Sequence, residues 1–199
     1  QTVTMIQLAS AFSAVINGGN YYQPHVVKEI NSESGAVVSS NDNTLVKRVV
    51  SEDASKLIRK YLEKTVEDDE GTANPARVKG YVIGGKTGTA EKWPRNEGKY
   101  LVSFAGFTPT DKPELMIYVV IDEPHVSDQA HSTYATEFAS EVLKDVLPML
   151  GIYKQTGKSD SAKKITLPST KKGNQLLEVP KGGFSSSTYK VAKSKKNNG

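Results

Sequence analysis

The feature that most constrains the fold is a series of three strand-like runs separated by short, turn-rich segments. The runs are YVIGGKTGTA, YLVSFAGF and ELMIYVVI, and they begin at residues 81, 100 and 114. The segments WPRNEGK and TPTDKPE join them, and both contain Pro with other turn-forming residues. Connections this short suit antiparallel neighbours, because parallel strands need a long crossover. The sequence therefore predicts an antiparallel sheet between residues 81 and 121.

Three amphipathic helices are predicted around this sheet. Apolar residues recur at helical spacing in TVTMIQLASAFSAVINGG, with Thr4 or Thr2 as the cap and Gly18 at the end. A second stripe runs from Ala54 to Val66 after a cap at Ser51, and an acidic loop, EDDEGTANP, follows it. A third runs over 132–150 and ends at Gly151. Between the first two helices, we expect a strand in YYQPHVVKEI after the Pro, a turn in NSESG and a short strand in AVV. The fold class is thus α+β, an antiparallel sheet flanked by helices.

Charge divides the chain into two predicted parts. Residues 1–151 carry 15 Lys/Arg against 20 Asp/Glu, a net charge of −5, whereas residues 152–199 carry 11 Lys against two acids, a net charge of +9. We expect a folded acidic body at 1–151 and a basic Ser/Thr/Lys/Gly-rich tail at 152–199 that is mostly extended or disordered, because the tail has little apolar surface to bury. The absence of Cys excludes disulfides and thiolate metal sites, and no apolar run approaches the length of a membrane span.

The stretch GYVIGGKTGT, residues 80–89, fits two incompatible motifs. It matches the phosphate-binding pattern G-x-x-x-x-G-K-[ST], and its end matches the K-T-G element of serine enzymes that react with penicillins. A phosphate-binding loop requires a buried strand before it and a helix after it. Here DDEGTANPARVK precedes the motif and the Pro-containing AEKWPRNEG follows it, so the phosphate-loop interpretation fails at both ends.

As part of a strand, the same residues form a plausible anion-binding edge. Lys86 supplies a cation, and the absent side chain of Gly88 lets a substrate lie against the backbone. Thr87 and Thr89 carry hydroxyls on either side of Gly88. The Thr89 amide can also donate to a developing oxyanion. Trp93 either lines the substrate groove or packs under the following turn.

Three blocks in this order resemble the C-terminal half of the transpeptidase domain of class B penicillin-binding proteins. They are TVTMIQLASAFSAVINGGNYYQPHVVKEI, GGKTGTAEKW and FAGFTPTDKPELMIYVVIDEP, and the resemblance spans residues 1–151. It implies a five-stranded antiparallel sheet with helices on both sides and a D,D-transpeptidase that cross-links peptidoglycan through a serine acyl-enzyme. It assigns Lys86 and Thr89 as catalytic and Thr87, Gly88 and Thr89 as substrate-binding. Trp93 is added to the substrate-binding residues from its position just past the strand, and no cofactor or metal is expected.

The resemblance also implies partners and a location. The partners are stem peptides ending in D-Ala-D-Ala, β-lactams that mimic them, and the upstream half of the same domain. The location is the extracytoplasmic face of the bacterial membrane, with the anchor N-terminal to this chain. The family's S-x-x-K nucleophile element and its S-x-N element are expected upstream of Gln1, so this chain alone is predicted to be inactive. Strings at Ser161, Ser169 and Ser187 fit S-x-x-K but lie in the Lys/Ser-rich tail, and Ser39-Ser40-Asn41 fits S-x-N in the wrong place.

Several alternatives remain open from the sequence. A D,D-carboxypeptidase or β-lactamase shares the K-T-G element, and a non-catalytic β-lactam sensor or scaffold would retain the fold. A metal site among the acids and His of 122–131 is the weaker interpretation of a polar loop. The basic tail is expected to be a solubilising linker, with anionic wall polymers or lipid headgroups as alternative partners and a faint PASTA-like start in EVPKGGF. Nucleic acid is not expected, because the tail has no Arg and few aromatic residues.

Overall fold

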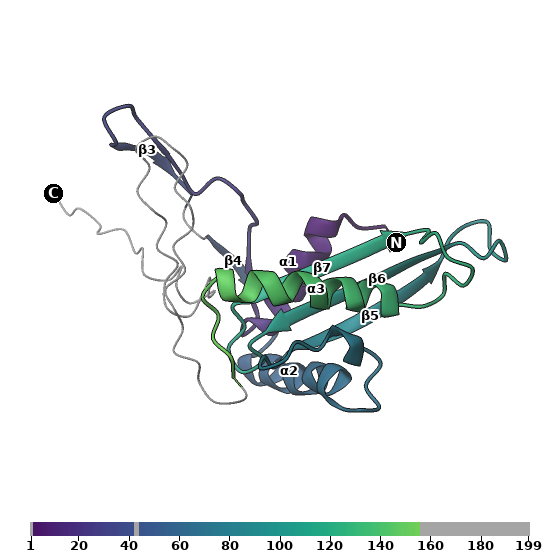
Figure 1. Ribbon diagram of the computed structural model, residues 1–199. Coiled ribbons are helices and arrows are strands. Elements are labelled where there is room, and N and C mark those ends of the chain that lie inside the picture. Colours follow the sequence, from purple (N-terminus) through teal and green to yellow (C-terminus); the bar gives the residue numbers. More distant parts are fainter. Residues whose placement is uncertain (1, 42–43, 156–199) are drawn as a thin grey trace.

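The computed structural model describes residues 2–41 and 44–155, and its centre is a three-stranded antiparallel sheet. The strands are β5 (Gly84–Glu91), β6 (Tyr100–Thr108) and β7 (Leu115–Asp122), in the order β5-β6-β7. The register places Gly85 opposite Gly106 and Phe104 opposite Val119. Figure 1 shows helix α3 (Thr133–Met149) lying across the sheet. The predicted antiparallel α+β fold is confirmed.

The two faces of β6 belong to two different clusters of apolar side chains. Because successive side chains point to opposite faces of a strand, Phe104 and Phe107 diverge. Phe104 is buried in a cluster with Ala139 and Leu143 of α3. Phe107 is buried in the other cluster, with Ile16 of helix α1 (Met5–Ile16) and Leu62 of helix α2 (Glu52–Glu67). The sheet therefore lies between α3 and α1, and α2 contributes to both clusters, Val66 to the one with α3 and Leu62 to the one with α1.

The helix ends follow the predicted capping residues. Thr4 caps α1 in a capping box with Gln7, and the Ser51 hydroxyl accepts a hydrogen bond from the Ala54 amide at the start of α2. After α3, Gly151 has a φ of 70°, a left-handed conformation that favours glycine. All three predicted helices are confirmed to within two residues.

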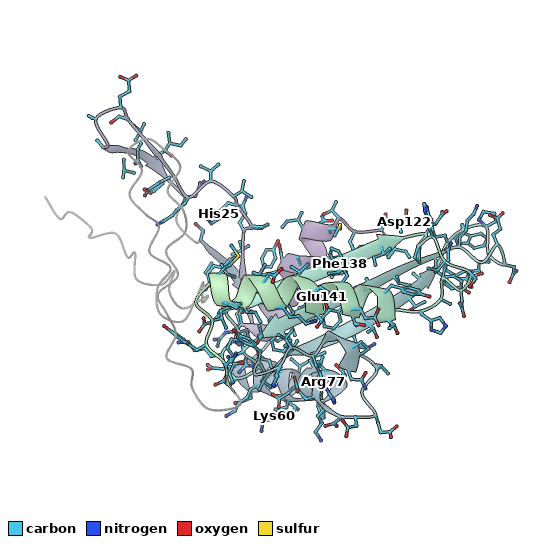
Figure 2. The ribbon with its side chains drawn as sticks, viewed as in Figure 1. His25, Lys60, Arg77, Asp122, Phe138 and Glu141 are labelled. Atoms are coloured by element: carbon cyan, nitrogen blue, oxygen red, sulfur yellow. The ribbon has the colours of Figure 1, made fainter. Side chains whose placement is uncertain are left out.

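The loop after α2 is more ordered than its acidic composition indicated. It contains the short 3-10 helix η1 (Asn74–Ala76) and is fixed by Arg77, labelled in Figure 2. The Arg77 guanidinium donates to the carbonyl of Val66, 2.8 Å away, and to that of Glu67. The Ser140 hydroxyl of α3 donates to the Arg77 carbonyl at 2.8 Å. Arg77 thus joins the end of α2 to α3.

The segment between α1 and α2 contains the predicted strands and two strands that were not predicted. The predicted strand after Pro24 is present but short: β2 (Glu29–Asn31) begins five residues after the proline, and a further strand, β1 (Asn20–Tyr22), ends before it. β2 pairs with β3 (Val37–Ser40) in a hairpin that projects from the body (Figure 1). β1 pairs with β4 (Leu45–Arg48), which was not predicted. These strands are three or four residues long, too short for a clear alternating pattern.

The described chain continues to pack beyond Gly151. Ile152 is buried in the same cluster as Phe104 and the α3 residues. The backbone amide of Gln155 donates a hydrogen bond to the Gly80 carbonyl at 2.8 Å. The division at 151/152 stays a prediction, because the remainder of the tail lies outside the described residues. Among the helices of residues 2–41 and 44–155, none combines the length and apolar character needed to cross a bilayer.

Candidate active site

The Lys86–Thr89 segment lies on β5, which is an edge strand of the central sheet. One side of β5 pairs with β6 along its whole length, and no second strand pairs with its other side in the described structure. Side chains alternate along a strand, so Lys86 and Gly88 share one face of the sheet while Thr87 and Thr89 share the other with Phe104. The side chains of the four residues therefore lie on both faces of the sheet, and the part of the structure that all four share is the open edge of the strand.

The direction of the β5 backbone follows from the hydrogen-bond ladder. Beyond the strand, the Lys92 amide donates to the Lys99 carbonyl at 2.9 Å, which extends the pairing of β5 with β6. Backbone groups in an antiparallel pair alternate between bonding the neighbour and pointing away from it. Even-numbered residues of β5 therefore bond β6, and the amides and carbonyls of Gly85, Thr87 and Thr89 point to the open edge. This is the geometry that adding an extended peptide requires.

Helix α2 occupies the beginning of this edge. The Thr65 hydroxyl donates a hydrogen bond to the Gly85 carbonyl, and the Glu67 carboxylate accepts one from the Ile83 amide at 2.9 Å. Sequence reasoning placed Thr65 in the apolar stripe of α2 and missed this contact. No local pattern signals it, because residues 65 and 85 are brought together only by packing of the helix on the strand.

The Lys86 side chain is exposed and bends around the edge of the strand. Its ammonium donates to the Thr87 carbonyl at 2.9 Å and lies 3.4 Å from the Thr87 hydroxyl. A cation, a hydroxyl and outward-pointing amides thus gather at one stretch of edge. An anionic group such as a carboxylate is the ligand that such donors favour. The roles of Lys86, Thr87 and Thr89 stay predictions.

The glycines around Lys86 have different neighbours. An added Cβ at Gly85 would lie 2.5 Å from the Phe104 ring and 2.7 Å from the Ala105 carbonyl oxygen. At Gly88 it would lie 2.6 Å from the Ser103 hydroxyl oxygen and 4.0 Å from its Cβ. Gly85 is therefore needed for packing, whereas Gly88 has only a mobile side-chain atom beside it.

Trp93 does not pack under the turn after β5. The residue is 82% exposed, and the Arg95 guanidinium carbon lies 5.6 Å from the centre of its ring. The turn-packing alternative was wrong, and a role in lining a substrate groove stays a prediction.

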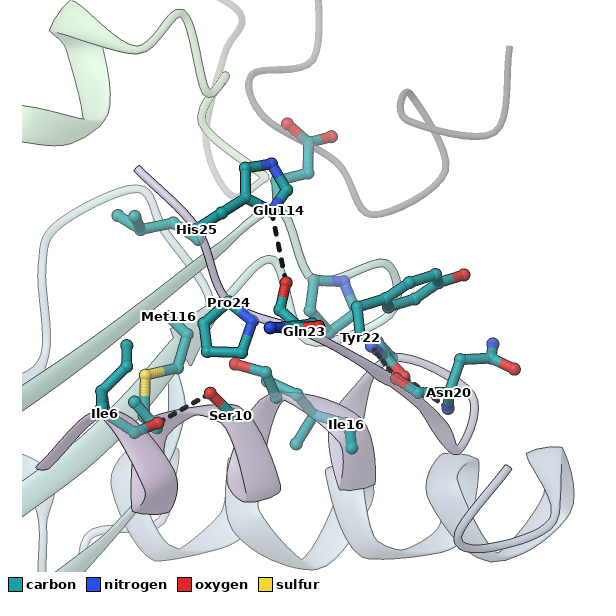
Figure 3. Close-up of a pocket in the computed structure, with 16 residues that line it drawn as sticks. Ile6, Ser10, Ile16, Asn20, Tyr22, Gln23, Pro24, His25, Glu114 and Met116 are labelled. Atoms are coloured by element: carbon teal, nitrogen blue, oxygen red, sulfur yellow. Dashed lines mark hydrogen bonds between the residues drawn. The ribbon is translucent and has the colours of Figure 1, made fainter. Parts of the chain in front are cut away.

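The described structure has a cavity of about 410 Å³ away from β5, between α1, residues 22–25 and residues 113–116 (Figure 3). Glu114 lines it, and burial raises the pKa of its carboxyl group. One carboxylate oxygen of Glu114 is buried without a hydrogen-bond partner among the described residues. Neither the cavity nor Glu114 was indicated by the sequence.

The polar loop near His131 is organised by pairwise contacts. His131 lies 2.9 Å from the Asp128 carboxylate, and the pKa of Asp128 is lowered by the Ala130 amide and by His131. The Lys92 ammonium bonds Asp122, labelled in Figure 2, at 2.8 Å. No group of three His or acidic residues within 2–41 and 44–155 could hold a metal ion, so these residues give no support to a metal site at 122–131.

Among the described residues, no string that fits S-x-N or S-x-x-K by sequence lies beside Lys86. Ser39, Ser40 and Asn41 belong to or follow the exposed strand β3, in a different sheet from Lys86. The S-x-x-K strings at Ser161 and Ser169, the third at 187 and the PASTA-like EVPKGGF all lie outside the described residues.

Comparison with known proteins gives three consistent findings. The chain is 40% identical over 185 residues to stage V sporulation protein D of Bacillus subtilis, covering 90% of this chain and 27% of that protein. It is 34% identical over 119 residues to a peptidoglycan D,D-transpeptidase FtsI homolog of Chlorokybus atmophyticus, covering 58% of this chain and 16% of that protein. The D,D-transpeptidase domain structure of a peptidoglycan glycosyltransferase from Eggerthella lenta superposes with a TM-score of 0.65 at 29% identity, covering 75% of this chain and 33% of that one.

The chain therefore spans about a quarter or less of the length of these two curated relatives. The family described as penicillin binding protein transpeptidase domain matches residues 1–144, a range that includes α1, the complete central sheet and most of α3. With the expected blocks, the expected fold and this match in agreement, the chain belongs to the transpeptidase domain family of penicillin-binding proteins, and its relatives are of the class B type.

Proposed function

We propose that the full-length protein containing this chain is a penicillin-binding peptidoglycan D,D-transpeptidase. The observation that carries the proposal is the position of Lys86, Thr87 and Thr89 at the open edge of β5, inside the region that the family matches. A serine hydroxyl, proposed to lie upstream of Gln1, attacks the carbonyl carbon of the penultimate D-Ala of a stem peptide. The terminal D-Ala leaves with a proton, and an amine of a second stem then attacks the ester and releases the serine.

This chain contributes one wall of that site. The donor peptide pairs with the edge of β5, where amides point outward. Lys86 attracts the terminal carboxylate, and the hydroxyls of Thr87 and Thr89 hydrogen-bond it. The Thr89 amide donates to the oxyanion that forms when the serine attacks. Gly88 leaves room for the peptide, and Trp93 lines the groove further along.

Further partners and the location are also part of the proposal. β-Lactams acylate the same serine because they mimic D-Ala-D-Ala, and the upstream half of the domain supplies the S-x-x-K and S-x-N elements. The protein acts at the extracytoplasmic face of the bacterial membrane, held by an N-terminal anchor. The charge of the basic segment 152–199 suits a solubilising linker, with anionic cell-wall polymers as the partner it would contact electrostatically.

The test is the intact mass of the full-length gene product after incubation with excess benzylpenicillin. We expect a single adduct on a serine upstream of Gln1. The Lys86→Ala variant should acylate about 100-fold more slowly, the order of effect of removing a group that stabilises transition-state charge. Lys60→Ala is the matched control, because it removes the same charge from an exposed position on α2 (Figure 2).

Three results would contradict parts of this proposal. Absence of any adduct would favour the non-catalytic sensor. Rapid hydrolysis of the penicillin, with no stable adduct, would favour a β-lactamase. Equal acylation rates of Lys86→Ala and Lys60→Ala would remove Lys86 from the site.

A further inference from the structure

The open edge of β5 has a defined beginning. Three successive outward-pointing positions of the strand are Gly85, Thr87 and Thr89, as its ladder with β6 requires. The first of these is already engaged, because its carbonyl accepts the Thr65 hydroxyl of α2. Just before the strand, the Ile83 amide donates to the Glu67 carboxylate, also on α2. Two backbone groups before Thr87, the Ile83 amide and the Gly85 carbonyl, are thus bonded to the helix, whereas the amides of Thr87 and Thr89 are directed at the open edge.

The Gly85 carbonyl belongs to the same peptide unit as the Lys86 amide. Residues 84 and 85 are both glycine, which gives the chain before Lys86 more rotational freedom than other residues would. The Thr65 hydroxyl fixes the plane of the peptide unit between Gly85 and Lys86 from the side opposite β6. The direction in which Lys86 leaves the strand depends on that plane.

We propose that Thr65 is a positioning residue for the transpeptidase site. By capping the Gly85 carbonyl, it makes an extended peptide or a β-lactam pair with β5 only from Thr87 onward, and it fixes the orientation of the Lys86 backbone. Thr65 touches neither the ligand nor the serine, so it acts through Gly85 and Lys86. This inference rests on the proposed function.

A second threonine provides a matched control. The Thr65 hydroxyl is also 2.8 Å from the Leu62 carbonyl, three residues earlier in its own helix. Thr136 of α3 makes the same local contact, since its hydroxyl donates to the Thr133 carbonyl at 2.8 Å. Thr136 is fully buried and its hydroxyl has no recorded contact with β5 among the described residues. Val has nearly the same shape as Thr but lacks the hydroxyl, so Thr→Val at either position removes one hydroxyl from a helix without changing the packing volume much.

The experiment measures acylation of the full-length protein by a fluorescent penicillin as a function of its concentration, for wild type, Thr65→Val, Thr65→Ser and Thr136→Val. We expect the first-order acylation constant of Thr65→Val to fall about three- to tenfold, the effect of one lost hydrogen bond. The apparent dissociation constant should stay within twofold, because Thr65 does not contact the penicillin. Thr65→Ser retains the hydroxyl and should acylate at the wild-type rate, and Thr136→Val should do so as well.

A measurement on the wild-type protein tests the register without any substitution. Amide hydrogen exchange before and after acylation by benzylpenicillin should show added protection at Thr89 and none at Gly85. The inference is overturned if Thr65→Val acylates as fast as Thr136→Val, or if protection extends to Gly85. Failure of wild type to form any adduct would instead overturn the proposed function, and this inference with it.

Discussion

At the residue scale, two glycines of one strand are predicted to respond differently to the same substitution. Gly85→Ala should lower the free energy of unfolding by about 1–3 kcal/mol, because the new methyl meets the Phe104 ring and the Ala105 carbonyl, neither of which can move freely. Gly88→Ala should cost less than ~1 kcal/mol, because only the Ser103 hydroxyl must rotate. Chemical denaturation of the full-length variants measures both.

The two variants also separate packing from function. Gly88→Ala should slow acylation by penicillin more than it lowers stability, because its methyl occupies the edge where the substrate is proposed to lie. Equal stability losses for the two variants would show that the aromatic packing beneath Gly85 is more adaptable than the distances indicate.

At the scale of elements, the sequence predicted the helices and strands that have a long apolar pattern and end-capping residues close in sequence. α2 has a capping Ser51 and a continuous apolar stripe, and its predicted limits match the structure. β4 has four residues that are all exposed, so burial left no alternating pattern in its sequence. The Thr65–Gly85 contact lay beyond prediction for another reason: it joins residues 20 positions apart, and only the packing of α2 on β5 creates it.

The cap of α2 can be tested against a helix start of the same residue type. Ser51→Ala should reduce stability by about 1 kcal/mol, because the Ala54 amide loses the hydroxyl oxygen that it bonds at 3.2 Å. Ser132 occupies the equivalent position of α3 but makes no capping hydrogen bond through its side chain. Ser132→Ala should therefore cost no more than ~0.5 kcal/mol in the same thermal or chemical denaturation. A larger loss at Ser132 than at Ser51 would contradict this account of the helix starts.

At the scale of the whole molecule, the sheet separates two regions with different chemistry. The β5 edge gathers donors and could be located from the K-T-G pattern once its strand context was recognised. The cavity by α1 could not, because its lining comes from α1, the segment after β1 and the start of β7. Composition says nothing about which of the 22 acidic residues lines the cavity, and Glu114 was not singled out. Long-range packing decides that.

Glu114 makes stability depend on pH in a defined direction. Burial raises the pKa of its carboxyl group in the folded protein, so folding favours the protonated form. Its favourable contribution is present below the pKa of the unfolded chain and is lost as pH rises through the folded pKa. The neutral Glu114→Gln variant should therefore be more stable than wild type at pH 8, by up to ~3 °C in Tm, and nearly equal at pH 4. Thermal unfolding of the full-length protein at both pH values measures this difference.

Glu33→Gln, at an exposed turn between β2 and β3, is the control and should leave Tm unchanged at either pH. A Glu114→Gln variant less stable than wild type at pH 8 would mean that the partly buried carboxylate has a cationic or donor partner in the full-length protein, and that the cavity is where that partner binds.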